Sequence, residues 1–270
     1  MKLYCFYTAA YQDLFDRWFA PSAALEYDLG VHRDPDALAV DYKQNGWLPI
    51  VRRKVDFILK AVSENRHRPF VFSDPDVQFF GPTRTPLLRS IGNRDLVFQK
   101  DAPGLGAVCT GFFVCRGNER TLRFWSAVRE SMDGSEDRDD QDCARALLLE
   151  TLPSWFTGRA ARSDRPRSPA AWLSQRRLNP FALRWGCLPS AFLGGGTLTG
   201  RLWQPGMTLP IPDPVLMHHA NYTVGLQNKV AQLRYVREVV TANLSSPNRG
   251  ACSQLQPMLD NRAYVNQRPQ

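Results

Sequence analysis

Short apolar runs alternate along the chain with segments in which apolar residues recur every three or four positions. The runs are rich in β-branched and aromatic residues and predict strands at residues 2–8, 25–29, 70–80, 95–99 and 109–115. The periodic segments predict helices at residues 12–20, 47–62, 86–91 and 141–150, a helix capped by Asn118, and one carrying Val230, Leu233 and Val236. This alternation favours an α/β sandwich with a mainly parallel sheet, whose ligand site lies at the carboxyl ends of the strands.

Two carboxylates, Asp74 and Asp76, interrupt the run at residues 70–80 and separate a strand from a second extended piece. An ionised carboxylate in such a place is costly unless a cation neutralises it. A divalent metal held at the end of the strand is therefore the first interpretation, and an Asx turn is the alternative. The same spacing recurs in three polar stretches that are typical of solvated turns or helix N-termini: Asp34/Asp36, Asp137/Asp139 and Asp140/Asp142.

The length of 270 residues and the 43% hydrophobic content predict one domain over residues 1–240, followed by a tail or strap at residues 241–270. No apolar run approaches the roughly 18 residues of a membrane span, and the N-terminus follows a strand pattern rather than that of a signal sequence. The six cysteines lack zinc-site spacing, so we expect reduced, mostly buried thiols in a cytoplasmic protein. Glycine-rich dinucleotide and P-loop motifs are absent, which argues against both of those enzyme classes.

The net charge of +8 is concentrated in residues 157–185, where seven arginines stand against Asp164 alone. They are Arg159, Arg162, Arg165, Arg167, Arg176, Arg177 and Arg184. We expect a basic insertion or lid here, and its interleaved Trp172 and Trp185 suit a phosphate-bearing partner: nucleic acid, an anionic membrane surface or a diphosphate-linked acceptor. A solvated surface loop is the alternative.

Two adjacent histidines, His218 and His219, stand near the predicted C-terminal helix. Neighbouring residues point in different directions, so we expect at most one of them to ligate a given metal. A lone buried histidine is more often a hydrogen-bonded core residue, which is the alternative for both. Gly225 and Lys229 follow in a polar turn entering the helix, where an anion would be stabilised and the lysine could reach a phosphate.

These motifs, taken in order, resemble those of the nucleotide-diphospho-sugar transferase family, glycosyltransferases of the GT-A fold related to the retaining galactosyl-, xylosyl- and glycogenin-type enzymes. The resemblance spans residues 1 to about 240 and is carried by Asp74-Pro75-Asp76-Val77, Thr110-Gly111-Phe112-Phe113, Asp140-Gln141-Asp142 and His219-Ala220-Asn221 with Gly225 and Lys229. It implies a Rossmann-like α/β/α sandwich.

The resemblance also implies roles for individual residues. Asp74 and Asp76 would hold Mn²⁺ or Mg²⁺ at the donor's diphosphate, with His219 as the third protein ligand. A further set would bind the nucleotide-sugar donor: Thr8, Ala9, Tyr11, Lys54, Asp74, Asp101, Thr110, Gly111, Gly225 and Lys229. The loop beside the anomeric carbon would supply the catalytic residues Asp140, Gln141 and Asp142.

The sequence therefore predicts a metal-dependent, retaining glycosyltransferase that uses a UDP-sugar. Its acceptor is left open among a glycan, a lipid-linked glycan and DNA, the last two through the segment from Arg159 to Arg184. One alternative is an enzyme that glycosylates modified DNA bases, as some viruses encode. Another is a non-catalytic basic binding module on a GT-A fold.

Overall fold

The computed structural model of the protein describes residues 1–35, 46–102, 107–150, 181–195 and 202–244. Its main sheet has six strands, in the spatial order β2 (Asp28–Asp34), β1 (Lys2–Thr8), β3 (Pro69–Ser73), β6 (Val108–Arg116), β5 (Leu96–Lys100) and β7 (Trp185–Cys187). Only β6 runs antiparallel to its neighbours in this sheet. The predicted α/β fold with a mainly parallel sheet is confirmed.

A second, three-stranded sheet adjoins the carboxyl end of β3. Its spatial order is β4 (Val77–Phe79), β9 (Met217–His219) and β8 (Phe192–Gly194). Because β4 follows β3 directly after the turn at Asp74 and Asp76, this pairing places the late strand β9 beside that turn. The backbone N–H of Ala220 donates to the carbonyl of Asp76 at 2.9 Å and closes the junction.

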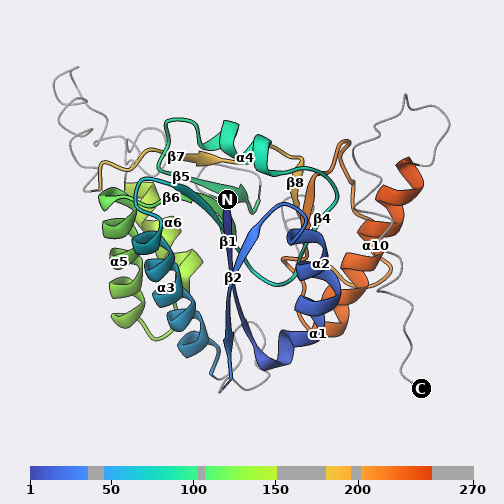
Figure 1. Ribbon diagram of the computed structural model, residues 1–270. Helices are drawn as coiled ribbons and strands as arrows, with labels where there is room; N and C mark the ends of the chain where they lie inside the picture. Colours follow the sequence, from blue (N-terminus) through green and yellow to red (C-terminus); the bar gives the residue numbers. More distant parts are fainter. Residues whose placement is uncertain (36–45, 103–106, 151–180, 196–201, 245–270) are drawn as a thin grey trace, which may run out of the picture.

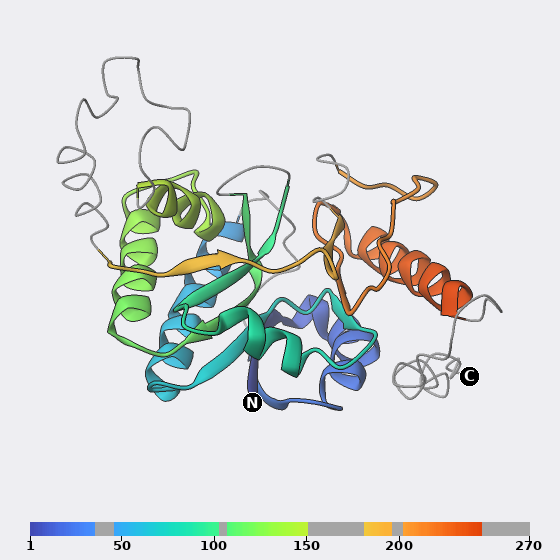
Figure 2. The same cartoon turned by 90° about the horizontal axis from the view of Figure 1, so that it is seen from above.

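Helices lie on both sides of the main sheet (Figures 1 and 2). One face is covered by α3 (Trp47–Glu64), α5 (Glu119–Asp133) and α6 (Asp140–Glu150). The other is covered by α4 (Arg84–Ile91) and by a helical N-terminal segment of η1 (Ala9–Tyr11), α1 (Gln12–Leu14), η2 (Phe15–Phe19) and α2 (Ala20–Ala23). Farther out, α10 (Leu226–Leu244) packs against the small sheet. Within the described residues no helix has the length and hydropathy that a bilayer crossing demands.

The inner strands β1, β3, β5 and β6 are buried on both faces, which explains why they are continuous apolar runs. Along β3, Phe70 and Phe72 belong to the cluster beneath α3 and α5, whereas Val71 belongs to the cluster on the opposite face. The helix predicted at residues 47–62 is amphipathic, and its apolar stripe is the face that packs on the sheet. The predicted cap is also confirmed: Asn118 forms a capping box with Thr121 at the start of α5.

Several predicted boundaries are wrong. The strand predicted at residues 25–29 spans Asp28–Asp34, and its His32 is stacked on Phe6. Strands β7 and β8 are three residues long and were not predicted. The last helix ends at Leu244, and residues 245–270 of the predicted tail lie outside the described part, so the predicted domain bounds stay a prediction.

The cysteines behave as predicted where the structure describes them. Five are free thiols, and four of these are buried while Cys187 is exposed. The sixth, Cys252, lies outside the described residues. Six of the seven arginines in the predicted basic segment lie outside them as well: Arg159, Arg162, Arg165, Arg167, Arg176 and Arg177.

The seventh, Arg184, contributes to a buried ion-pair network around Asp95. The Asp95 carboxylate is fully buried and accepts hydrogen bonds from Arg120 at 2.6 and 2.9 Å, from Asn118 at 2.9 Å and from the Arg184 backbone at 2.9 Å. Burial alone would raise the pKa of Asp95, but these donors lower it to about 2. The network ties β5 to the start of α5 and to the edge strand β7.

We predict that Asp95→Asn lowers the free energy of unfolding at pH 7 by about 2 kcal/mol, because it removes a buried partner of two arginines. The folded-state pKa lies below the ordinary value of 3.8, so the wild-type stabilisation is present above pH ~4 and is lost as the pH falls towards 2. Urea unfolding at pH 7 and at pH 3 should therefore show the two proteins converging in acid. The control Asp56→Asn breaks an exposed pair with Arg129 and should cost under about 1 kcal/mol; an equal loss would contradict the assignment.

Candidate active site

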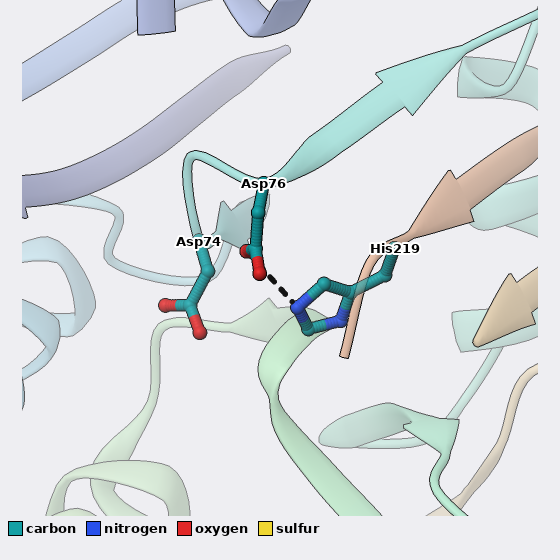
Figure 3. Close-up of side chains that lie close together, drawn as sticks. All are labelled: Asp74, Asp76 and His219. Atoms are coloured by element: carbon teal, nitrogen blue, oxygen red, sulfur yellow. Dashed lines mark ion pairs between the residues drawn. The ribbon is translucent and has the colours of Figure 1, made fainter. Parts of the chain in front are cut away.

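Three candidate metal ligands converge where the two sheets meet (Figure 3). Asp74 and Asp76 form the turn after β3, and His219 ends β9 directly opposite Val77 of β4. One ligand atom from each side chain lies within 4.8 Å of the other two. His219 Nε2 is 3.2 Å from Asp76 Oδ1. Two carboxylates and one imidazole form a donor set that suits a hard divalent cation.

The two neighbouring histidines occupy different environments, as alternation along a strand requires. His219 Nδ1 is 2.8 Å from Gln99 Oε1, so it can donate its proton there and leave Nε2 facing the carboxylates. His218 is fully buried on the other side, with Nδ1 3.3 Å from Gln78 Nε2. Burial lowers the pKa of His218 to about 3, which keeps this imidazole neutral.

Two lysines neutralise the paired carboxylates. Lys54, on α3, places Nζ 3.0 Å from Asp74 and 3.2 Å from Asp140. Lys229, on the first turn of α10, places Nζ 2.6 Å from Asp76. The cationic groups thus come from an early and a late helix and meet at one turn.

These contacts set the charge states of the cluster. Burial alone would raise the pKa of Asp76, but Lys229 and His219 hold it well below its ordinary value. Burial would lower the pKa of His219, but the Asp76 carboxylate raises it to about 10. These shifts favour an ionised Asp76 beside an imidazole of His219 that is protonated on both nitrogens. A metal ion that binds here must displace that proton.

A second polar cluster surrounds Asp101, just after β5. Its carboxylate is paired with Arg145 and accepts hydrogen bonds from Asn221 Nδ2 at 3.0 Å and from the Tyr222 hydroxyl at 3.1 Å. Gln141 joins it, with Nε2 3.3 Å from Asp101 and Oε1 3.2 Å from the Thr110 backbone nitrogen. Gln141, predicted to lie beside the anomeric carbon of the donor sugar, is thus hydrogen-bonded to β6 and to the residue that follows β5.

Both clusters open into one cavity of about 330 Å³. Eleven residues named from the sequence as candidate donor-binding, metal or catalytic residues line it in addition to Asp74 and Asp76: Thr8, Tyr11, Lys54, Asp101, Thr110, Gly111, Asp140, Gln141, Asp142, His219 and Lys229. Thr8 Oγ1 is buried and has no hydrogen-bond partner among the described residues, and its role towards a donor stays a prediction. Ala9 and Gly225 do not line the cavity.

Arg145 was not predicted as a site residue, and Asp34 and Asp139 lie in environments that differ from the expected ones. Arg145 lies four residues after Gln141 on α6, and this helical spacing could have placed it on the same face. Asp34, expected in a solvated turn, is buried at the end of β2 and paired with Arg53. Asp139 is buried too and accepts a hydrogen bond from the Asp142 backbone at 2.7 Å, so only its helix N-terminal position agrees with the prediction. Burial and the neighbouring Asp140 raise its pKa to about 6.

Comparison with solved structures supports the fold. The chain is similar to a glycosyltransferase involved in the glycosylation of the major capsid of PBCV-1, with a TM-score of 0.51 and 10% identity over 87% of this chain and 100% of that one. The apo-form glycosyltransferase GlyE of Streptococcus pneumoniae TIGR4 is more distant, with a TM-score of 0.39 and 12% identity over 57% of this chain and 46% of its own. No curated protein matches the sequence.

The mainly parallel sheet, with the cavity and the Asp-Asp-His cluster at its carboxyl edge, agrees with the GT-A fold. A sequence model of the nucleotide-diphospho-sugar transferases matches residues 12–233, and the chain belongs to that family. The resemblance, the fold class and the enzyme class predicted from the sequence are confirmed.

Gly111 provides a test of the cluster's geometry. A Cβ at this position would lie 2.5 Å from both Asp74 Oδ2 and His219 Cε1, so both contacts would have to open. We predict that Gly111→Ala weakens Mn²⁺ binding roughly 10–100-fold with little change in melting temperature. The matched control is Gly134→Ala, whose Cβ would come no closer than 3.8 Å to a neighbour. Titration calorimetry showing equal Mn²⁺ affinity in Gly111→Ala and the wild type would contradict the proposed geometry.

Proposed function

We propose that this protein is a metal-dependent glycosyltransferase that moves a sugar from a UDP-sugar to an acceptor and retains the anomeric configuration. The observation that supports it most directly is the convergence of Asp74, Asp76 and His219 at the cavity wall. A transferase that acts on a diphosphate must neutralise charge at that place, and the non-catalytic alternative gives no reason for such a site.

The residues present fit a bound metal. Gly111 leaves room beside Asp74 and His219, and Gln99 orients the imidazole for ligation through Nε2. Oxygen-rich ligands favour Mg²⁺ or Mn²⁺, and the imidazole favours Mn²⁺. When bound, such an ion would act as a Lewis acid for the negative charge that develops on the departing diphosphate.

Side chains of the protein would bind and orient the donor. Lys54 and Lys229 place two ammonium groups at the cavity, where they can attract and orient a diphosphate. Thr8 and Tyr11 line the end of the cavity beside β1, a position that suits the nucleoside. Asp101 and Thr110 would contact the donor sugar.

Retention requires a polar group on the sugar face opposite the leaving diphosphate. Asp140, Gln141 and Asp142 are the candidates, since all three begin α6 and line the cavity. Gln141 is the most constrained of them, because Thr110 and Asp101 hold both ends of its amide. A side chain held in this way can stabilise an oxocarbenium-like state without reorganising.

For the acceptor we propose a glycan, free or lipid-linked, in a cytoplasmic reaction that suits the free buried thiols. The net charge of +8 favours DNA as a second candidate. Adding duplex DNA to a donor-turnover assay separates them. Stimulation that disappears as salt rises would support DNA, and turnover that ignores DNA but responds to glycans would support the first proposal.

We predict that Asp76→Asn reduces Mn²⁺-dependent release of UDP from a UDP-sugar by roughly 100-fold or more, because the site loses one anionic ligand. Circular dichroism should show the fold intact. The control Asp13→Asn makes the same change in an exposed pair with Arg17 and should leave turnover unaltered. Full activity in Asp76→Asn, or a wild type that turns over no donor with Mn²⁺, would refute the proposed enzyme.

A further inference from the structure

Both oxygens of the Asp76 carboxylate already have a nitrogen of the protein beside them. Oδ1 is 3.2 Å from His219 Nε2, and Oδ2 is 2.6 Å from Lys229 Nζ. The Asp76 and Lys229 side chains are only 6% and 13% exposed, so solvent screens this pair weakly. A metal ion that approaches Asp76 therefore meets an ammonium group at contact distance from its ligand.

We infer that Lys229 acts as a resident counter-ion of Asp76, which a divalent cation displaces and thereby delivers to the donor's diphosphate. The inference rests on the proposed function and adds to it an order of events. Two positive charges a few ångströms apart in a buried site repel one another strongly. Binding of the metal at Asp76 would consequently drive the ammonium away from Oδ2.

The two lysines of the site hold their carboxylates in different ways. Lys54 bridges Asp74 and Asp140 and also lies over the Phe72 ring at 5.7 Å, so it keeps two contacts if Asp74 turns to a metal. Lys229 contacts Asp76 and, at 3.3 Å, the Ala220 carbonyl. A long, flexible side chain with three donors can exchange these for phosphate oxygens.

The backbone of Lys229 would stay in place during this exchange. Its N–H donates to the Gly225 carbonyl at 3.0 Å, which fixes the first turn of α10 at the cavity wall. Gly225 itself has a left-handed backbone, with φ of 91°, that begins the helix there. Only the side chain has to swing, and the cavity it lines is where the diphosphate would lie. Because the metal has to displace this side chain from Asp76 before it can reach a phosphate, the metal should bind before, or together with, the nucleotide.

Mn²⁺ titration without nucleotide tests the competition directly. We expect Lys229→Met to bind Mn²⁺ about five- to tenfold more tightly than the wild type, since the competitor is gone, and to bind UDP in the presence of Mn²⁺ about tenfold more weakly. Lys229→Arg keeps the charge and should stay near the wild-type Mn²⁺ affinity. Lys60→Met removes an exposed charge far from these contacts and is the control for general electrostatics.

Displacement, as opposed to static repulsion, is measured on the wild-type protein by acylating lysine amines and following the Lys229 peptide by mass spectrometry. Mn²⁺ alone should raise the modification rate of Lys229, and UDP added with Mn²⁺ should lower it again. This readout does not depend on whether Lys229→Met folds.

The outcomes separate the two proposals. A wild type that binds no Mn²⁺ would refute the proposed metal site and this inference with it. A wild type that binds Mn²⁺ while Lys229 reactivity stays constant or falls would leave the proposed function standing and overturn the inference alone. Equal or weaker Mn²⁺ binding by a folded Lys229→Met would do the same.

Discussion

Two carboxylates at the end of a buried strand have to be neutralised, and the site is arranged around that requirement. Asp74 and Asp76 lie in the turn between β3 and β4, where burial penalises each negative charge. The compensating positive charge comes from Lys54, 20 residues before Asp74, and from Lys229, 153 residues after Asp76. The same turn therefore joins the helix layer, the main sheet and the C-terminal helix, and it places three groups able to ligate a metal at the wall of one cavity.

Backbone hydrogen bonds between strands fix the positions of the side chains in the site. His219 is held by the ladder between β4 and β9, Asp74 donates its backbone N–H to Gly111 on β6 at 2.7 Å, and Gln141 reaches across to the same strand. Groups held by strands keep their positions better than groups on free loops. Lys54 and Lys229 also line the cavity that opens beside these side chains. The protein is thus pre-organised for charge before any ligand binds.

Much of this arrangement was predictable from local signals. The apolar stripe of α3, the cap at Asn118 and the framing of Asp74 and Asp76 by apolar strands all depend on neighbours in sequence. What was missed depends on partners far along the chain. The buried Asp101 and Asp95, paired with Arg145 and Arg184, look like ordinary polar residues until the strands pair, and β8 is too short to show a period. The distinction between His218 and His219 required the register of β9.

We propose that one hard cation is held by Asp74, Asp76 and His219 at the cavity that receives the donor. The most direct measurement is anomalous diffraction at the manganese edge from crystals grown with Mn²⁺ and UDP. The account predicts a single strong peak within coordination distance of the two carboxylates and of His219 Nε2, with the diphosphate beside it. A manganese peak elsewhere on the protein, or nucleotide bound in the cavity with no metal between it and Asp76, would contradict it.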